Sequence, residues 1–233
     1  MKHLLYCIFE EEAVALPKEW KGRVGLLHAH GLSAALSRSA TVASPPPLED
    51  LLEYERVVEW LDERRSVIPL RYGNVLDSEA SVVELLARRG KEFHELLAEL
   101  DGKTELGLRI LLHEPRAGPP IFSPLASASS PGTAYLDSLR KRFASEGGLS
   151  GAESRLVDRI RESVRHLHAA IASELRPAPH GRLLSLYLLL PKKNVNECRR
   201  CLLPLVEDTS WKVLLTGPWP PYHTVALRAA AHA

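Results

Sequence analysis

The sequence predicts an α+β protein of two domains, and three observations lead to this fold class. Short apolar runs alternate with longer stretches in which apolar residues recur at helical spacing. A segment rich in proline, glycine, serine and alanine, residues 114–131, divides this alternation into two parts. The 233 residues are 45% hydrophobic and 25% charged, which suffices for a sizeable buried core. We therefore expect a first domain over 1–113, a linker or long loop over 114–131, a second domain over 132–217 and a C-terminal arm over 218–233.

Strands are expected to open the first domain. Residues 4–9 and 24–28 are apolar runs that predict buried strands, and a short third strand is expected at 39–43. Another short strand is predicted at 67–70. It contains Pro69, which is typical of the edge or the end of a sheet.

Two amphipathic helices are predicted in the same domain. The first begins at Leu48, and its apolar side chains fall on one face: Leu51, Tyr54, Val58 and Leu61. The second follows Asp77 or Ser78, either of which can cap it, and ends at Asp101-Gly102. A strand over 104–112 is expected to close the domain.

The second domain is predicted to contain helices and a strand–helix–strand unit. A helix is expected over 132–144, and a longer one over 153–176. The apolar side chains of the longer helix recur every three or four residues: Leu156, Ile160, Val164, Leu167, Ile171 and Leu175. A strand at 183–190, a helix at 195–203 and a strand at 211–216 follow. This order predicts a ferredoxin-like arrangement with flanking helices.

Three prolines between residues 218 and 221 predict a stiff, extended arm at the C-terminus. The arm carries Trp219 and Tyr222 in a chain that is only 6% aromatic. One interpretation is that the arm packs on its own domain and pins the two domains together. The other is that the two rings form a docking surface. We favour the internal packing, because aromatic rings usually find partners within the protein.

Composition excludes several classes of protein. Thirty basic and twenty-nine acidic residues give a net charge of +1, which does not favour binding to nucleic acid or an anionic membrane. The apolar N-terminus ends at Glu10-Glu11-Glu12 without a cleavage site, and no stretch approaches the roughly twenty apolar residues that span a bilayer. Three cysteines do not form a disulfide framework. We expect a cytoplasmic protein.

Motifs for catalysis, cofactors or metals are weak. Cys198 and Cys201 form a C-x-x-C pair beside two arginines, so a thiol redox protein is the alternative function, although the pair is expected within a helix. The pairs His28/His30 and His166/His168 lack further ligands nearby, so surface histidines are the favoured interpretation. The chain has no glycine-rich phosphate loop and no G-x-S-x-G motif. We expect no catalytic residue, no cofactor and no metal.

One further segment, IPLRYGNV at 68–75, contains a strand that ends at an arginine and an aromatic residue. Arg71 in that position can bind carboxylates or carbonyl oxygens in a forked geometry. An internal clamp between loop and helix is the favoured interpretation from physics alone, and contact with a partner is the alternative.

These segments resemble the gas vesicle protein family GvpF/GvpL. The resemblance rests on IPLRYGNV at 68–75, EYERVVEWL at 53–61, GTAYL at 132–136 and LTGPWPPYHTV at 215–225. It runs from the first strand to the C-terminal arm. The chain departs from the family pattern at Tyr72, where phenylalanine is usual, and at His223-Thr224, where serine–phenylalanine is usual.

The resemblance implies a two-domain α+β protein made with gas vesicles, the hollow protein-walled flotation bodies of some bacteria and archaea. It implies an accessory or minor structural protein that binds the hydrophobic shell protein GvpA, together with other accessory proteins. Such a protein supports nucleation and prevents shell-protein aggregation, in the cytoplasm or in the vesicle. It implies no enzyme activity. The candidate structural or partner-contact residues are Arg71, Tyr72, Trp219 and Tyr222.

Overall fold

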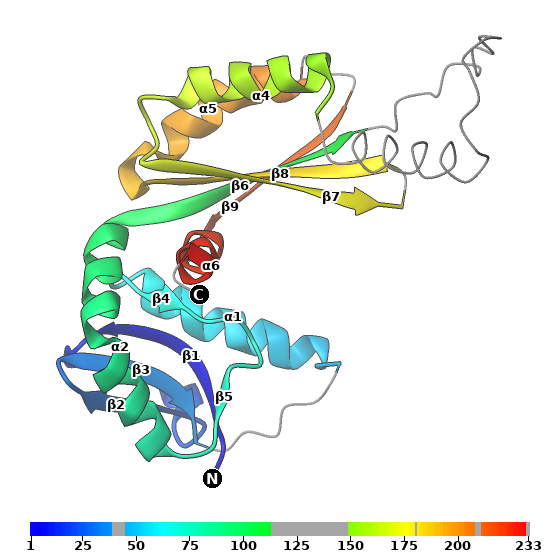
Figure 1. The fold of residues 1–233 in the computed structure, drawn as a ribbon. Helices are drawn as coiled ribbons and strands as arrows, with labels where there is room; N and C mark the ends of the chain where they lie inside the picture. The colour runs from blue at the N-terminus through cyan, green and yellow to red at the C-terminus, as the bar shows by residue number, and fades with distance from the viewer. Residues whose placement is uncertain (39–44, 113–148, 180, 208–210, 232–233) are drawn as a thin grey trace, which may run out of the picture.

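The computed structural model describes residues 1–38, 45–112, 149–179, 181–207 and 211–231. The chain forms two halves, each built on an antiparallel sheet with helices against it, and a C-terminal helix lies between the halves (Figure 1). This mixed architecture confirms the predicted α+β class. The predicted strand at 39–43, the linker at 114–131 and the helix at 132–144 lie outside the described residues. Among the described helices, none is long and apolar enough to cross a membrane.

The N-terminal half contains a sheet with the strand order β2-β3-β1-β4, and β5 also pairs with β1. Its strands are β1 (His3–Glu10), β2 (Val24–Ala29), β3 (Leu32–Ser37), β4 (Ile68–Pro69) and β5 (Val75–Leu76); its helices are η1 (Lys18–Trp20), α1 (Leu48–Asp62) and α2 (Glu79–Leu100). Ser78 caps α2 by accepting a hydrogen bond from the Ser81 amide. Proline-containing β4 lies at an edge, as predicted.

The sequence prediction missed strand β3. The two-residue turn His30-Gly31 joins β2 to β3, and both residues have positive φ, 56° and 75°. Turns of this kind match the twist of a β-hairpin, and glycine adopts positive φ without strain. The His-Gly pair between two apolar runs was therefore the available sequence signal for this hairpin.

Helices α1 and α2 pack against opposite faces of the first sheet. Leu5 and Ile8 of β1 join the core under α2, whereas Leu4, Tyr6 and Phe9 join the core under α1. A register shift between Leu5 and Cys7 interrupts the usual alternation. As a result, both Tyr6 and Cys7 lie in the core under α1, and both faces of this sheet are covered.

The C-terminal half has the β-α-β-β-α-β order of a ferredoxin-like fold. Its elements are β6 (Lys103–Leu112), α4 (Gly151–Val164), β7 (Ala170–Ala178), β8 (Gly181–Pro191), η2 (Lys192–Asn194), α5 (Val195–Glu207) and β9 (Lys212–Trp219). The strand order is β7-β8-β6-β9, and α4 and α5 cover one face (Figure 1). The predicted strand–helix–strand unit is confirmed. Strand β6, expected to close the first domain, is instead a central strand of the second sheet.

The long helix predicted over 153–176 is wrong beyond Val164. Helix α4 ends there, and Ala170–Ala178 forms the edge strand β7. Ile171 and Leu175 pack against the same core as α4. Residues four apart share a face in a strand as well as in a helix, so the apolar spacing fitted both structures.

The extended C-terminal arm is also corrected. Strand β9 continues to Trp219, and helix α6 (Tyr222–Ala231) begins directly after Pro221. The Pro221 carbonyl accepts a hydrogen bond from the Val225 amide. Proline fits the start of a helix because the amides there have no partner within the helix. The prolines therefore precede a helix rather than extending the arm.

Candidate functional site

The start of α6 is held by a carboxylate of the second sheet. Glu105 of β6 has a side chain that is only 3% exposed, and it accepts hydrogen bonds from the first turn of α6. The amides of His223 and Thr224 lie 3.4 and 3.0 Å from its oxygens, and the Thr224 hydroxyl lies at 3.0 Å. The Nδ1 atom of His223 lies at 2.8 Å. A buried carboxylate at a helix N-terminus satisfies free amides and complements the helix dipole.

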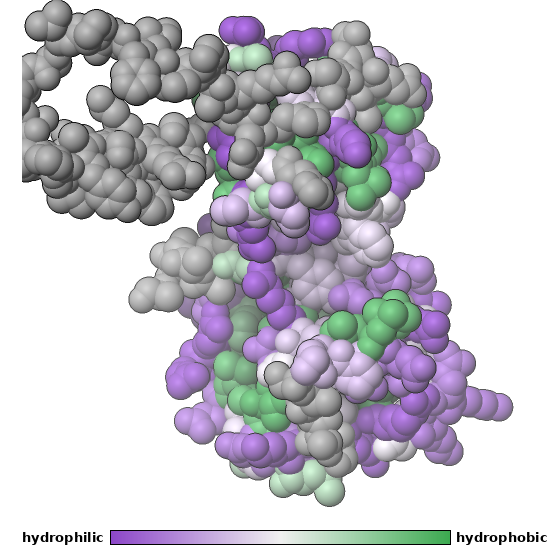
Figure 2. All heavy atoms as spheres, turned by 90° about the vertical axis from the view of Figure 1, so that its right-hand side faces the viewer, coloured by the Kyte–Doolittle hydropathy of each residue, from purple (hydrophilic) through white to green (hydrophobic). Residues whose placement is uncertain are grey.

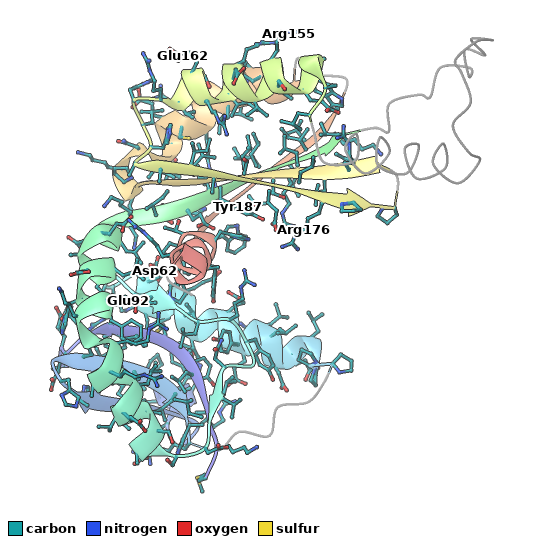
Figure 3. The ribbon with its side chains drawn as sticks, in the orientation of Figure 1. Asp62, Glu92, Arg155, Glu162, Arg176 and Tyr187 are labelled. Carbon is teal, nitrogen blue, oxygen red and sulfur yellow. The ribbon has the colours of Figure 1, made fainter. Side chains whose placement is uncertain are left out.

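An aromatic contact strengthens the same junction. The His223 ring stacks on Tyr187 of β8 with 3.4 Å between ring centroids and 14° between planes. Figure 3 shows Tyr187 projecting from the sheet toward α6. His223 and Thr224, two of the three residues at which the sequence departs from the motifs that it resembles, both bind Glu105. Glu105, which the sequence prediction missed, was visible only as a lone acid in an apolar strand.

Tyr222 connects α6 to the first half of the molecule. Its hydroxyl donates to a Glu55 carboxylate oxygen at 3.2 Å, and its ring packs beside the core under α1. Desolvation raises the pKa of Glu55, and the Tyr222 hydrogen bond lowers it in part. Arg228 of α6 donates to Glu99 of α2 at 2.5 Å. Tyr222 thus holds α6 to the first half, while His223 and Thr224 of the same helix turn hold it to the second.

Trp219 differs from Tyr222 although only two residues separate them. Its side chain is 43% exposed at the end of β9. Its backbone carbonyl accepts a hydrogen bond from the Thr104 hydroxyl at 3.0 Å, so the backbone is fixed while the ring reaches solvent. The two aromatic residues of the arm therefore have different environments.

A cleft of about 550 Å³ opens between the halves beside Trp219. Its lining residues come from the end of α1 and the residue after it, from β6, η2 and the start of α5, and from the two prolines that flank Trp219: Glu59, Asp62, Glu63, Thr104, Lys192, Val195, Asn196, Pro218 and Pro220. Lys192 lies 3.2 Å from an Asp62 carboxylate oxygen. Burial raises the pKa of Asp62, and the nearby ammonium opposes that rise.

Arg71 and Tyr72 lie together in the loop between β4 and β5. The Arg71 side chain is exposed and has no hydrogen bond or ion pair within the part of the chain that the structure describes. The internal clamp favoured from sequence is therefore not formed among these residues. Tyr72 instead packs edge-on against Tyr54, with 5.4 Å between ring centroids. Asn74 closes the loop by donating to the Arg71 carbonyl at 2.6 Å.

A free sheet edge lies in the N-terminal half. Among the described residues, β3 is the strand that pairs with β2, and the outer edge of β2 is bridged only at Val24, by Lys21. A hollow of about 900 Å³ adjoins this edge. Its lining residues come from the N-terminus, β2, β3 and the start of α2: Met1, His3, Gly25, Leu26, Leu27, Leu36, Arg38, Ser78, Glu79 and Ala80.

The cysteines do not support thiol redox chemistry. Cys198 is fully buried in α5, and burial raises its pKa to about 11. Burial also raises the pKa of Cys7. A thiol with a raised pKa contains little of the reactive thiolate at neutral pH.

The histidine pairs do not gather further ligands. Nδ1 of His28 lies 2.8 Å from the Ser33 hydroxyl, and Nδ1 of His168 lies 2.6 Å from the Val164 carbonyl. Within the described ranges, no group of three histidine, cysteine, aspartate or glutamate side chains is arranged to hold a metal ion.

Comparison with known proteins identifies the family. The profile described as "Gas vesicle synthesis protein GvpL/GvpF" matches residues 2–226. The chain belongs to this GvpL/GvpF family. The family resemblance of the motifs is therefore confirmed. Gas vesicle protein F of Streptomyces sp. (strain CB03234) is 24% identical over 215 residues, which cover 84% of this chain and 85% of that protein.

Two crystal structures of GvpF proteins share the fold. The protein from Microcystis aeruginosa is 16% identical with a TM-score of 0.73, and the match covers 96% of this chain and 98% of that one. The protein from Anabaena sp. PCC7120 is 15% identical with a TM-score of 0.69, covering 96% and 95%. The two-sheet architecture of the GvpL/GvpF family therefore extends over nearly the whole chain.

Proposed function

We propose that this GvpL/GvpF family member is a non-enzymatic accessory protein that binds the hydrophobic shell protein GvpA at the free edge of β2. By covering GvpA before it polymerises, the protein supports nucleation and limits aggregation, alongside other gas vesicle accessory proteins. It acts in the cytoplasm and at the gas vesicle. The observation that carries this proposal is the outer edge of β2, which within the described part of the chain is bridged only at Val24 and adjoins a hollow lined in part by leucines.

The edge of β2 has the chemistry that strand addition needs. Unpaired amides and carbonyls along an edge strand can pair with a strand of another chain. Strand β2 has the sequence VGLLHA, which contains no aspartate, glutamate, lysine, arginine or proline. Leu26, Leu27 and Leu36 line the adjoining hollow and can receive apolar side chains of the added strand. A small apolar shell subunit presents strand edges and apolar side chains of the complementary kind.

A pair of matched substitutions tests this proposal. Leu27 on β2 and Ile171 on β7 are both partly buried on an edge strand, and each packs against the core of its own half. Capture of GvpA by Leu27→Lys should fall at least about tenfold, because a charge in the edge opposes strand addition. Capture by Ile171→Lys should equal that of the wild type.

Circular dichroism must show that both variants are folded. Equal GvpA capture by Leu27→Lys and wild type would remove β2 from the interface. Washed, intact vesicles then distinguish two forms of the proposal: retention of the protein indicates a vesicle component, and its loss indicates an assembly factor that is released.

The four residues proposed from sequence divide into two groups. Arg71 and Trp219 are exposed and are proposed as additional partner contacts. Tyr72 and Tyr222 pack against Tyr54 and its surroundings, and their proposed role is structural.

A further inference from the structure

The two faces of the second sheet are covered to different extents. Alternation along β6 directs Leu108 and Ile110 into the core under α4 and α5. Arg109 and Leu111 therefore point to the opposite face, the one that α6 contacts. Helix α6 reaches that face near Glu105 and Tyr187. Figure 1 looks nearly along the α6 axis while the strands run across the view, so α6 crosses one part of the sheet.

The remainder of this face carries leucines and cations from neighbouring strands. Arg109 pairs in register with Leu214, and Leu111 pairs with both Lys212 and Leu183. Leu214 is 57% exposed. Arg109 and Lys212 are also exposed, and neither has an ion pair within the described part of the chain. In Figure 3, Arg176 of β7 projects from the same side of the sheet as Tyr187, and it forms an ion pair with Glu174 of the same strand at 2.6 Å. We call these residues, Arg109, Leu111, Leu183, Lys212 and Leu214, the open face.

Helix α1 runs below the second sheet and carries exposed leucines of its own (Figure 1). Leu48 is 69% exposed and Leu52 is 48% exposed. Their spacing places them on one stripe of α1 with Glu55, which binds Tyr222 of α6. Figure 2 shows hydrophobic surface on both halves of the molecule, above and below a narrower middle. Apolar side chains are thus exposed on both sides of the junction between the halves.

We propose that the open face binds an acidic amphipathic helix of a partner protein, lying beside α6. Helix α6 demonstrates that this sheet face accepts a helix with α1 on its other side. Strands β6 and β8 have 10 and 11 residues, which corresponds to roughly 33 Å of length, whereas one helix is about 10 Å wide. The length left beyond α6 accommodates one more helix.

The charge of the open face selects the occupant. Arg109 and Lys212, which have no ion partner among the described residues, flank the exposed Leu214 across β6 and β9. A helix with leucines facing the sheet and glutamates beside them satisfies both features. A basic helix would be repelled by Arg109 and Lys212 at the same positions. The open face is separate from the edge of β2, so this inference does not depend on the proposed binding of GvpA.

The first test uses designed peptides as probes. One is a helical peptide of about five turns with leucines on one face and glutamates flanking them, and the other has lysines in place of the glutamates. Fluorescence anisotropy at low salt should show the glutamate peptide binding the full chain at least tenfold more tightly than the lysine peptide. Failure of the wild type to bind the glutamate peptide, or equal binding of both peptides, would overturn the proposal.

Charge reversal then locates the site. The double variant Arg109→Glu, Lys212→Glu should bind the glutamate peptide more weakly than the wild type does, and the lysine peptide more tightly. The control is Arg88→Glu with Lys91→Glu, which makes the same change in net charge on exposed positions of α2. It should keep the wild-type preference. An unchanged preference in the open-face variant, or an equal reversal in the α2 control, contradicts the assignment.

A crossed measurement separates this inference from the proposed function. The Leu27→Lys variant should bind the glutamate peptide as tightly as the wild type, because β2 lies in the other sheet. Loss of peptide binding in that variant would contradict the independence of the open face. Loss of GvpA capture with intact peptide binding supports both assignments.

Discussion

The two sheets of this protein differ in what the described elements leave exposed: an edge in the first sheet and part of a face in the second. The first sheet has helices on both faces, and the outer edge of its strand β2 has no second strand beside it among the described residues, apart from a single bridge between Val24 and Lys21. The second sheet has edge strands that discourage pairing: β7 carries Glu174, Arg176 and Pro177, and β9 carries Lys212 and Pro218. Among the described elements, α6 contacts only part of the face opposite α4 and α5. The N-terminal half therefore exposes backbone hydrogen-bonding groups to a partner, and the C-terminal half exposes side chains.

One chain can in this way avoid unwanted association while keeping two kinds of contact. Charged residues and prolines on an edge strand protect a sheet against strand addition. Strand β2 lacks this protection, whereas β4 of the same sheet is short and contains Pro69. The absence of protection at only one long edge is consistent with selection for strand addition at that position.

The largest effect is expected from removal of the Glu105 carboxylate. Glu105→Ala leaves the α6 amides and the His223 ring without their acceptor in a buried place, so the free energy of unfolding should fall by about 3–5 kcal/mol. Release of α6 would expose more of the second sheet's open face, while both faces of the first sheet would stay covered. Urea denaturation measures the first effect, and hydrogen exchange of the α6 amides measures the second.

The matched control for Glu105 is Glu99, which also binds α6 but at the surface. Its partner Arg228 has a side chain that is 52% exposed. Glu99→Ala should therefore change the free energy of unfolding by less than about 1 kcal/mol. Similar losses for the two variants would mean that Glu105 is not the main attachment of α6.

The next effect separates the two aromatic residues of the C-terminal segment. Tyr222→Ala removes a ring packed beside the α1 core and a hydrogen bond to Glu55, which should cost about 2–4 kcal/mol of stability. Trp219→Ala removes an exposed ring and should cost less than about 1 kcal/mol. Thermal unfolding compares the two variants directly. A reversed order would show that Trp219, rather than Tyr222, joins the halves.

Much of the fold follows from local sequence patterns. Helices α1 and α2 have apolar faces with clear helical spacing, and strands β1 and β8 are nearly continuous apolar runs. These features are local, so sequence reasoning found them. The ferredoxin-like unit was also predicted, because a strand, helix and strand in this order have few compact arrangements.

The sequence-based prediction is wrong where a local pattern fits two kinds of secondary structure. It also fails where the structure depends on a contact between residues far apart in the sequence. Ile171 and Leu175 fitted a helix and a strand equally, and only pairing with β8 decides between them. The pairing of β6 with β9 joins residues about a hundred positions apart, which no local pattern reports. The role of Glu105 depends on α6, which forms after a proline pair that predicted extended structure. The edge of β2 and the open face likewise depend on the strand order of the two sheets, which local sequence patterns do not show.

A smaller effect concerns the pH dependence of the junction between the halves. Burial raises the pKa of Glu55 in the folded state, so the folded protein holds this proton more strongly than the unfolded chain. Stability from this group is present below the unfolded pKa and is lost as pH rises through the folded pKa. Glu55→Gln keeps an acceptor for Tyr222 and should slightly raise the free energy of unfolding at pH 7.

Urea denaturation of wild type and Glu55→Gln between pH 4 and pH 7 checks this expectation. The difference between the two proteins should grow with rising pH and favour the variant. A difference that is constant with pH would show that the carboxyl group does not titrate differently in the folded and unfolded states.

The smallest effect on stability is expected at Arg71. Its side chain is exposed and unpaired within the described residues, so Arg71→Ala should change the free energy of unfolding by less than about 0.5 kcal/mol. The matched substitution Tyr72→Ala removes the edge-on contact with Tyr54 and should cost about 1–2 kcal/mol. Weaker GvpA capture by Arg71→Ala, with unchanged stability, would extend the partner surface of the first half beyond β2. A stability loss as large as that of Tyr72→Ala would instead assign Arg71 a structural role, because an exposed contact residue does not contribute to folding by that amount.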